Sequence, residues 1–302
     1  MTDDTLPTWR PGLARDAVGG FLAAAEDVPA EERVAVFDVD GTLWCEKPRY
    51  IQLDFFLAEL QRAVASHPEL EERSEYRALL AGDQVAIADI GLVPIAAALV
   101  ELCEGMTPEE FEERVRGFFA DARHGDRGVS MREMRYQPML DLVRALRSKG
   151  FEVFLVTGGG TEFVRAVSRS LFGVPPEGVV GSQVGYELVR VDGRPQLRRT
   201  DELFGAVNEG APKISNIQRL LGRRPIFAAG NSPGDREMLE YATSGRTPSL
   251  AILVEHDDAE REYAYRSVAG TFDSDEPIEA TAERLGWTSV SMRDDWETVF
   301  AR

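Results

Sequence analysis

The stretch VAVFDVDGTLW, residues 34–44, decides the fold of this 302-residue chain. Its first four residues are apolar, which is typical of a short strand buried on both faces of a sheet. Asp38 and Asp40 follow two positions apart, so their carboxylates point the same way at the carboxyl end of that strand. Open α/β sheets bind their ligands at this edge. An acidic strand-to-turn junction is the plain alternative, because Asp and Gly are ordinary turn residues.

The paired carboxylates indicate a metal site with a nucleophile and a proton-transfer group. Two neighbouring carboxylates repel each other unless a cation or a proton lies between them. Asp38 and Asp40 therefore predict an Mg²⁺ site, with one carboxylate free to attack and the other free to move protons.

The hydrophobic pattern on either side of this strand predicts an α/β protein with an all-helical insertion. Residues 1–30 are expected to form an arm with one helix, and residues 48–135 show helical spacing with no convincing strand. From there a strand–helix rhythm resumes, so residues 31–47 and 136–302 are expected to build a Rossmann-like three-layer core around a mostly parallel sheet. A helical insert directly after the first strand would lie over its carboxyl end as a lid.

Shorter segments of the core are also predicted from their pattern. Apolar runs predict further strands at residues 151–156, 179–185, 225–229 and 250–255. Residues 187–199 are expected to form a hairpin that turns at Asp192-Gly193. The tail from about residue 257 to 302 is expected to add further helical turns.

Composition narrows the functional classes. A formal net charge of −18 argues against a nucleic-acid binder and against binding to an anionic membrane surface. It does not exclude a small phosphorylated substrate, which needs only a local positive site. The arginine-rich, lysine-poor composition is compatible with a bacterium of high genomic GC content.

Targeting and redox signals favour the cytoplasm. The N-terminus is acidic and lacks the basic-then-apolar pattern of a signal peptide. The longest uncharged apolar stretch, residues 90–100, contains a proline and is too short to cross a bilayer. Cys45 and Cys103 form neither a disulfide framework nor a metal-ligand spacing, which fits a reducing compartment.

A glycine-rich turn after the second predicted strand indicates a phosphate site. The strand ends in Thr157, which supplies a hydroxyl, and Gly158 to Gly160 follow where a helix begins. Exposed N–H groups at a helix N-terminus bind anions, although a glycine run alone also fits a flexible turn. The dinucleotide fingerprint G-x-G-x-x-G fails because Phe163 occupies its last position, and no Walker-type loop occurs.

The string DVDGTLW resembles the first motif of the haloacid dehalogenase-like (HAD) hydrolases, most of which are phosphatases. Thr157 matches the residue that ends their second motif and holds a phosphoryl oxygen. Lys213, at the start of a helix in APKISNIQRLL, matches their lysine that neutralises the nucleophile, although most lysines simply lie on the surface. The segments GTLWCEKP, SLFGVPPEGVVGS, GRRPIFAAGNSPGD, EHDDAEREYAY and SMRDDWETVF resemble a bacterial, phosphoserine-phosphatase-like branch with a helical C1-type cap.

The resemblance implies a set of catalytic roles. Asp38 would attack phosphorus to form an aspartyl phosphate, and Asp40 would act as general acid and base. Mg²⁺ would be held by Asp38, the backbone carbonyl of Asp40, and the segment GNSPGD. In that segment Asn231 replaces the acidic residue usual in the family, and Asp235 matches the second acidic position. Because an Asn oxygen still binds a hard cation, we expect a variant metal site with one charge fewer.

The expected activity is Mg²⁺-dependent hydrolysis of a small phosphorylated metabolite, with Thr157, the Gly158 amide and Lys213 around the transferring group. A phosphotransferase that uses the same aspartyl phosphate and a non-catalytic phosphate-binding protein are the alternatives. A dehalogenase is disfavoured, because its chemistry needs no metal and no second acid where Asp40 stands.

Two further groups of polar residues are weaker candidates. Residues that lie where the core passes into the insert are expected to include contacts with the substrate's leaving group, or else to form a polar linker: Glu46, Lys47, Arg49 and Tyr50. Metal binding by His256, Asp257 and Asp258 is less favoured, because polar residues are common at strand ends.

Overall fold

A parallel sheet forms the centre of the molecule. The computed structural model describes residues 5–245 and 248–301, so residues 1–4 of the expected N-terminal arm and residues 246–247 and 302 of the expected core lie outside the described part. Within it, six strands form one sheet in the order β3-β2-β1-β6-β7-β8. These strands are β1 Val34–Phe37, β2 Glu152–Gly160, β3 Val179–Ser182, β6 Phe227–Gly230, β7 Leu250–Glu255 and β8 Thr288–Ser291. Every neighbouring pair is parallel.

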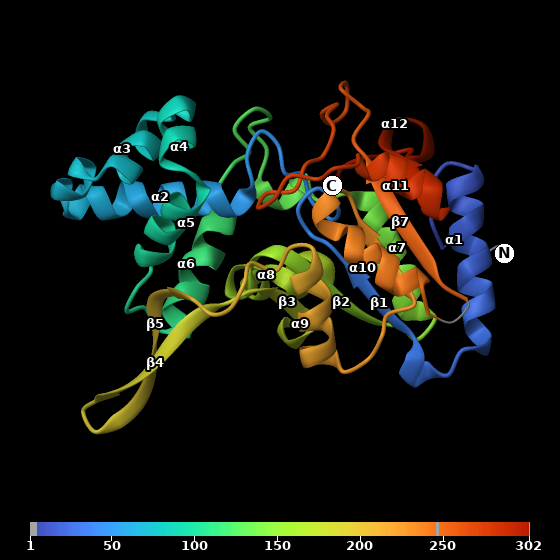
Figure 1. Ribbon diagram of the computed structural model, residues 1–302, viewed down its shortest axis with the longest axis horizontal. Helices are drawn as coiled ribbons and strands as arrows, with labels where there is room; N and C mark the ends of the chain where they lie inside the picture. Colours follow the sequence, from blue (N-terminus) through green and yellow to red (C-terminus); the bar gives the residue numbers. More distant parts are fainter. Residues whose placement is uncertain (1–4, 246–247, 302) are drawn as a thin grey trace.

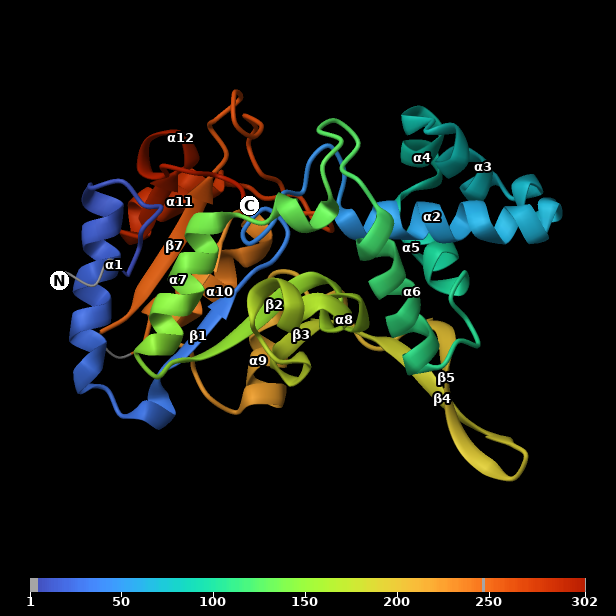
Figure 2. The same cartoon turned by 180° about the vertical axis from the view of Figure 1, so that it is seen from behind.

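Helices cover both faces of this sheet. On one face, side chains such as Phe37 and Leu155 join a buried cluster with α1 Leu13–Ala24, α7 Gln137–Ser148 and α8 Thr161–Phe172 (Figure 2). On the other face, Val36 and Val156 join a second cluster with α9 Ala211–Leu221, α10 Arg236–Thr243 and α11 Ile278–Leu285. Alternate residues of each strand thus enter opposite clusters, as expected for an extended chain. The predicted three-layer, Rossmann-like α/β fold is confirmed.

Five helices follow β1 and lie to one side of the sheet (Figure 1). They are α2 Ile51–Ser66, α3 Ser74–Ala81, α4 Gln84–Ile90, α5 Leu92–Glu101 and α6 Pro108–Asp121. The helical reading of residues 48–135 is confirmed, since the described residues there form no named strand. Thr107 starts α6 with a capping box, in which its hydroxyl accepts from the Glu110 amide and the Glu110 carboxylate accepts from the Thr107 amide.

A two-stranded hairpin extends from the sheet toward these helices. It consists of β4 Val184–Val191 and β5 Arg194–Leu203, and it turns at Asp192 and Gly193, both with positive φ. Two positive φ values match the two-residue turn that the Asp-Gly pair predicts. The Arg199 backbone exchanges hydrogen bonds with Gly105 and Met106, just before α6. The hairpin is therefore confirmed, and it contacts the helical part of the chain.

The tail differs from its prediction. Helical turns do occur there, in α11 and in α12 Met292–Asp295, but Thr288–Ser291 forms the parallel edge strand β8. Its sequence, TSVS, has one apolar residue, and only Val290 is buried. An edge strand this short carries no apolar run, so its pattern could not be separated from that of a loop.

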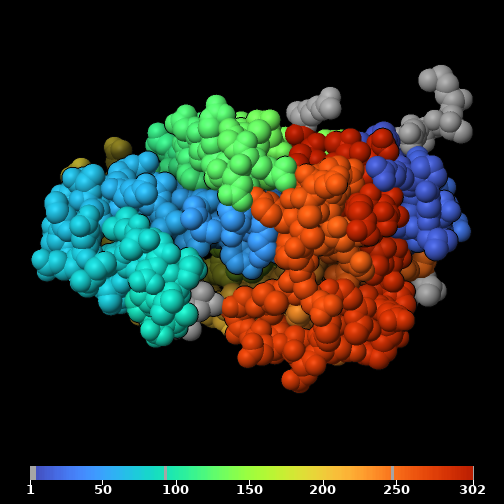
Figure 3. Space-filling model, turned by 90° about the horizontal axis from the view of Figure 1, so that it is seen from above, coloured from blue at the N-terminus to red at the C-terminus, as the bar shows by residue number. Residues whose placement is uncertain are grey.

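The two ends of the described chain lie against each other. Arg10 donates its backbone N–H to Asp295, and Glu297 donates to Thr8. Figure 3 shows the N-terminal and C-terminal segments side by side, with the helices after β1 at the opposite end of the molecule. Among the described residues no single helix has the length and apolar character to cross a membrane. Helix α4 and the segment Pro94–Glu101 would be long and apolar enough only when taken together, and their axes are bent by 98°.

Candidate active site

Three strand ends bring the candidate residues together. Phe37 of β1 is in register with Leu155 of β2 and with Ala229 of β6. The polar residues that follow these positions, Asp38, Thr157 and Asn231, therefore lie at the same edge of the sheet, although Thr157 is still part of β2. Asp38 is held there by its backbone N–H, which donates to the Ala229 carbonyl at 2.9 Å.

Lys213 links two of the predicted carboxylates. Its Nζ donates to Asp38 Oδ1 at 2.7 Å, to Asp235 Oδ1 at 2.6 Å and to the Val156 carbonyl at 2.9 Å. It lies in the first turn of α9 and is only 2% exposed. Burial alone would lower the pKa of Lys213, but the charges of Asp235 and Asp38 outweigh burial and raise it. Lys213 is therefore a buried, charged ammonium group in contact with the candidate nucleophile.

The contact with Lys213 does not fully balance the negative charge around Asp38. Burial, followed by repulsion from the Asp235 carboxylate, raises the pKa of Asp38 well above its usual range, and Lys213 opposes this effect. One ammonium thus lies between two buried carboxylates. Such a pair is stabilised by a further cation.

Asp40 has the environment of an acid–base group. Burial raises its pKa to about 7, and the hydrogen bond from Trp44 Nε1 to Asp40 Oδ1, 2.7 Å long, opposes the rise. Such a carboxyl group exchanges protons near neutral pH. Gly41 follows with φ +73°, and a Cβ there would lie 2.0 Å from Asn231 Nδ2. Glycine is therefore required where the loop passes the Asn231 side chain.

The structure corrects the predicted end of the second strand, because β2 continues through Gly158 to Gly160 and α8 begins at Thr161. This glycine segment, called the glycine turn below, is fixed from several directions. Thr157 is fully buried, and its Oγ1 accepts from the Gly159 amide at 2.9 Å. Asn208 Nδ2 donates to the Thr157 carbonyl at 2.9 Å, and Ser182 Oγ donates to the Gly158 carbonyl at 2.7 Å. From α2, Gln52 Oε1 accepts from the Gly160 amide at 2.8 Å. Sequence analysis missed Asn208 and Gln52, which no motif marks, and gave no role to Ser182, the last residue of SLFGVPPEGVVGS.

Asn231 and Asp235 close the site on the β6 side. Asp235 Oδ2 accepts from the backbone amides of Asn231 at 3.0 Å and Ser232 at 3.1 Å. Asn231 Oδ1 accepts from Thr42 Oγ1 at 3.3 Å, and Asn231 Nδ2 donates to Ser267 Oγ at 3.1 Å. The Asn231 amide is thus held in place beside the carboxylates.

These donors fit Mg²⁺ by their chemistry. Asp38, Asp235 and Asn231 offer carboxylate and amide oxygens, which are hard ligands, and the excess negative charge at Asp38 favours a cation. Among the described residues no three His, Cys, Asp or Glu side chains are arranged as a metal site. Mg²⁺ commonly uses only one or two carboxylates, with waters and substrate phosphate completing its shell, so the smaller set suffices.

A buried polar network lies next to Asn231. His256 Nε2 contacts the Gly41 carbonyl at 2.9 Å, and its Nδ1 contacts Glu262 Oε2 at 3.4 Å. Glu262 Oε1 also accepts from Tyr136 and from Cys45. Both His256 ring nitrogens therefore have oxygen partners within the protein, which favours a structural role over a metal ligand.

Asp257 and Asp258 also have partners within the fold. Asp257 accepts from Ser291 Oγ at 2.5 Å, and Asp258 accepts from the backbone amide of Arg261 at 3.0 Å. Cys45 is buried, and burial raises the pKa of its thiol, so it is not an activated nucleophile.

The candidates for leaving-group contacts differ in position. Glu46 is 94% buried, with Oε1 at 3.5 Å from Asn231 Nδ2, and Lys47 Nζ lies 4.4 Å from the centre of the Tyr265 ring. Arg49 is exposed and forms an ion pair with Asp54. The fourth candidate, Tyr50, is 41% exposed. Glu46 reaches the carboxylate cluster, and the hydroxyl of Tyr50 also lies near it, since burial and the charges of Glu46 and Asp40 raise the pKa of Tyr50.

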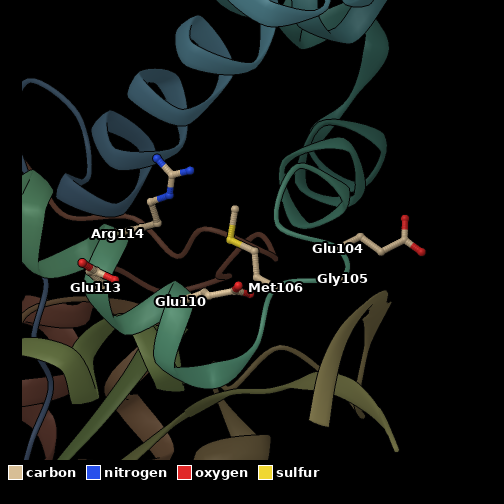
Figure 4. Close-up of a pocket in the computed structure, with 6 residues that line it drawn as sticks. All are labelled: Glu104, Gly105, Met106, Glu110, Glu113 and Arg114. Atoms are coloured by element: carbon tan, nitrogen blue, oxygen red, sulfur yellow. The ribbon is translucent and has the colours of Figure 1, made fainter. Parts of the chain in front are cut away.

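A hollow of about 640 Å³ lies away from this edge, at the start of α6 (Figure 4). It is lined by Glu104, Gly105, Met106, Glu110, Glu113 and Arg114. Three carboxylates line it, so it would repel a phosphate, and none of its residues belongs to the cluster around Asp38.

Comparisons with known proteins agree with this architecture. A family model described as haloacid dehalogenase-like hydrolase matches residues 35–240. No curated protein matches the chain. A protein of unknown function from Bordetella pertussis Tohama I is similar in structure, with a TM-score of 0.53 and 19% identity over 86% of this chain and 98% of the other. A functionally unknown protein from Anaerococcus prevotii DSM 20548 has a TM-score of 0.52 and 14% identity, over 80% and 85%.

At these identities the likeness to solved structures concerns the fold. A phosphoserine phosphohydrolase-like protein from Francisella tularensis subsp. tularensis SCHU S4 overlaps less well, with a TM-score of 0.39 and 16% identity over 84% of this chain and 99% of the other. The family model covers more than two thirds of the chain, from β1 to α10, and includes every strand end that meets at Asp38. The chain therefore belongs to the haloacid dehalogenase-like hydrolases.

Proposed function

We propose that this protein is an Mg²⁺-dependent phosphomonoester hydrolase that acts on a small phosphorylated metabolite through an aspartyl phosphate on Asp38. The observation that carries the proposal is the contact of Lys213 with both Asp38 and Asp235 at the edge where Thr157 and the glycine turn also lie. Family membership supports a hydrolase.

The first step would use Asp38 and Asp40. An Asp38 oxygen attacks phosphorus, a bond forms between them, and the bond from phosphorus to the leaving oxygen breaks in line. Asp40, whose pKa lies near neutrality, gives its proton to that leaving oxygen. The products of this step are a free alcohol and a phosphorylated Asp38.

The second step would release phosphate. Asp40, now ionised, takes a proton from water, and the water oxygen attacks phosphorus while the bond to Asp38 breaks. Lys213 and the backbone around Thr157 and Gly158 offer positive charge and N–H groups to the phosphoryl oxygens in both steps. Asp38, the Asp40 carbonyl, Asn231 and Asp235 would hold Mg²⁺, which neutralises charge between carboxylate and phosphate.

The setting of the reaction is also part of the proposal. Helices α2–α6 follow β1 directly, and Gln52 of α2 contacts the glycine turn, which supports a cap over the site for residues 48–135. Cys45 and Cys103 are both buried and free, which agrees with a reducing cytoplasm.

The test is phosphate release from p-nitrophenyl phosphate, with Mg²⁺ and with EDTA, for the wild type and for Asp38→Asn. We expect Mg²⁺-dependent release that falls by on the order of 10³-fold or more in the variant, because the nucleophile is gone. Asp16→Asn, on the exposed side of α1, is the matched control and should keep wild-type activity. Equal release by wild type and Asp38→Asn would contradict the proposal.

Two outcomes separate this function from its rivals. Phosphate that appears on an added alcohol instead of in water would identify a phosphotransferase. Binding of phosphate esters without turnover under any divalent metal would identify a binding protein.

A further inference from the structure

A cavity of about 280 Å³ lies beside the glycine turn, and nothing in the proposed reaction yet uses it. Gly158 to Gly160 form part of its lining, and other lining residues come from α2, α5, α6, α8 and the β4–β5 hairpin. Most of its side chains are apolar: Phe56, Ala96, Leu99, Val100, Phe111, Phe163, Val184, Leu203 and Val207. Helix, sheet and hairpin thus enclose one apolar space at the phosphate loop.

The position of the cavity fixes what could occupy it. Gly158 is both part of its lining and part of the proposed phosphate cradle. Gln52, which accepts from the Gly160 amide, also lines it. An ester whose phosphate is bound at Thr157 and Gly158 therefore has this space next to its phosphate, and its organic part is the natural occupant.

The size and lining of the cavity limit that organic part. A cavity of about 150 Å³ accommodates benzene, so about 280 Å³ leaves room for a bicyclic aromatic group. An ammonium or a carboxylate moved from water into such apolar walls is strongly disfavoured unless it is paired. Apart from Arg199 and Glu162, which lie 3.5 Å from each other, charged side chains are absent from the described lining, so most of its walls favour an apolar group.

One polar side chain in the lining lacks a complete set of partners. Arg199 is 97% buried, and its Nε has no hydrogen-bond partner among residues 5–245 and 248–301. Its Nη1 reaches Glu162 only at 3.5 Å, and its guanidinium stacks 3.9 Å from the centre of the Phe111 ring. A buried N–H without an acceptor is costly, so an acceptor on the ligand would be stabilising.

We propose that this cavity binds the leaving group of the substrate, and that this group is apolar, about the size of two fused rings, with one oxygen acceptor for Arg199. The proposal rests on the proposed function, because it places the leaving group of the same phosphate ester. It assigns a substrate class to the site: phosphate esters of aromatic or similarly apolar alcohols.

The first experiment compares kcat/KM for 1-naphthyl phosphate and O-phosphoserine, with acetyl phosphate as a substrate that has a very small leaving group. The wild type should prefer 1-naphthyl phosphate to O-phosphoserine by at least about tenfold, the discrimination that one or two buried methylene groups provide. Equal or reversed preference, in an enzyme that hydrolyses acetyl phosphate in an Asp38-dependent way, would overturn this inference and leave the proposed function intact.

A cavity-filling variant tests the location. Ala96→Leu adds a branched side chain to the lining of the cavity, whereas the neighbouring Ala97 is exposed and outside it, so Ala97→Leu is the matched control. The ratio of kcat/KM for 1-naphthyl phosphate over acetyl phosphate should fall about tenfold or more in Ala96→Leu and stay at the wild-type value in Ala97→Leu. An equal ratio in both variants would place the leaving group elsewhere.

Binding of the product gives a readout without turnover. 1-Naphthol, followed by its fluorescence, should bind the wild type and the inactive Asp38→Asn protein alike, and bind Ala96→Leu more weakly. Absence of 1-naphthol binding by all three would refute the cavity assignment, even if phosphate esters are hydrolysed. Binding by Asp38→Asn without any ester hydrolysis by the wild type would instead contradict the proposed function alone.

The acceptor for Arg199 is tested with phenol esters. The wild type should bind 4-carboxyphenyl phosphate with a lower KM than phenyl phosphate, and Arg199→Lys, which keeps the charge but loses Nε, should reduce that advantage. A wild-type KM that is no lower for the carboxylated ester would remove the acceptor from the proposal.

Discussion

At the scale of single residues, Glu262 shows how a buried charge is stabilised in this fold. Its Oε1 accepts from Tyr136 Oη at 2.8 Å, and its Oε2 accepts from the Tyr263 amide at 2.6 Å and contacts His256. Burial would raise the pKa of Glu262, but the hydrogen bond and charge of His256, followed by the hydrogen bonds from Cys45 and the Tyr263 amide, outweigh burial and lower it. The ionised form is therefore the one that the folded state favours.

We predict that Glu262→Gln lowers the free energy of unfolding by about 1–3 kcal/mol at pH 7, because the partners of the carboxylate are left with a poorer acceptor. The folded pKa lies below the ordinary value of 4.5, so this stabilisation is present above pH 4.5 and is lost as pH falls through the folded pKa. Urea unfolding at several pH values should show the difference shrink below pH 4.5. The control is Glu260→Gln, an exposed position in the same segment, which should leave the free energy of unfolding unchanged at every pH. A stability difference between Glu262→Gln and the wild type that does not change with pH would contradict this account.

The Asn231 side chain allows a second prediction about charge. An oxygen of a carboxylate in its place would lie about where Asn231 Nδ2 now lies, 3.5 Å from Glu46 Oε1. Without a cation, Asn231→Asp should lower the melting temperature in EDTA by roughly 2–4 °C, the effect of about 1 kcal/mol in a protein of this size. Mg²⁺ should restore the melting temperature of the variant. The rise that Mg²⁺ causes should be larger in Asn231→Asp than in the wild type, because the added charge strengthens Mg²⁺ binding.

The control for this prediction is Asn231→Asp combined with Glu46→Gln. Removing the Glu46 charge removes the repulsion, so the double variant should melt close to Glu46→Gln alone in EDTA. An equal loss from Asn231→Asp in both backgrounds would show that repulsion from Glu46 is not the cause.

Only part of this site could be predicted from local sequence patterns. Asp38, Thr157 and Lys213 stand in recognisable strings, so each could be assigned from a few neighbouring residues. Gln52 and Asn208 contact the glycine turn across 108 and 51 positions of sequence, and no local pattern carries such a pairing. The same holds for His256 and Glu262, whose role depends on which loops the fold brings beside Asn231.

At the scale of elements, the apolar strands and the amphipathic helices were predictable from the sequence, whereas the edge strand β8 was not. β1 is a buried apolar run, β7 contains such a run at residues 251–254 and β2 an apolar run at residues 153–156, and the Asp192-Gly193 turn specifies the hairpin chemically. β8 joins the sheet through backbone hydrogen bonds to β7, so its place follows from topology more than from its own side chains. This is why the tail prediction was wrong in that element.

Helix α1 offers a direct test of element energetics. Gly19 lies inside it with helical backbone geometry, and a Cβ there would meet nothing within 4 Å. Gly19→Ala should therefore raise the free energy of unfolding by about 0.5–1 kcal/mol, because alanine loses less backbone entropy in a helix.

Gly193→Ala provides the opposite case for the same measurement. Its surroundings are equally open, but φ is +77°, which disfavours any residue with a Cβ. Denaturant unfolding of both variants should therefore give changes of opposite sign. A loss of stability in Gly19→Ala would show that α1 is held by contacts that its exposed face does not reveal.

At the scale of the whole molecule, an aromatic cluster joins the helices after β1 to the sheet. Phe163 of α8 lies 5.4 Å from Phe55 of α2 and 5.7 Å from Phe119 of α6, measured between ring centres. Trp44, in the loop after β1, stacks on Phe119 at 5.8 Å. The buried apolar cluster is therefore continuous from one part to the other, so the wild type should unfold in one cooperative transition.

Phe163→Ala should break this coupling. The substitution removes a ring that is 1% exposed and should cost about 3–5 kcal/mol, concentrated at the junction. Differential scanning calorimetry should then resolve a broadened or double transition, with a van't Hoff enthalpy below the calorimetric one. Phe21→Ala is the matched control, because the ring of Phe21 in α1 packs on Phe151 and Phe227, which belong to the sheet layers. It should lower the melting temperature while one transition remains. A single transition in both variants would show that the hairpin and backbone contacts at Arg199 suffice to couple the helices to the sheet.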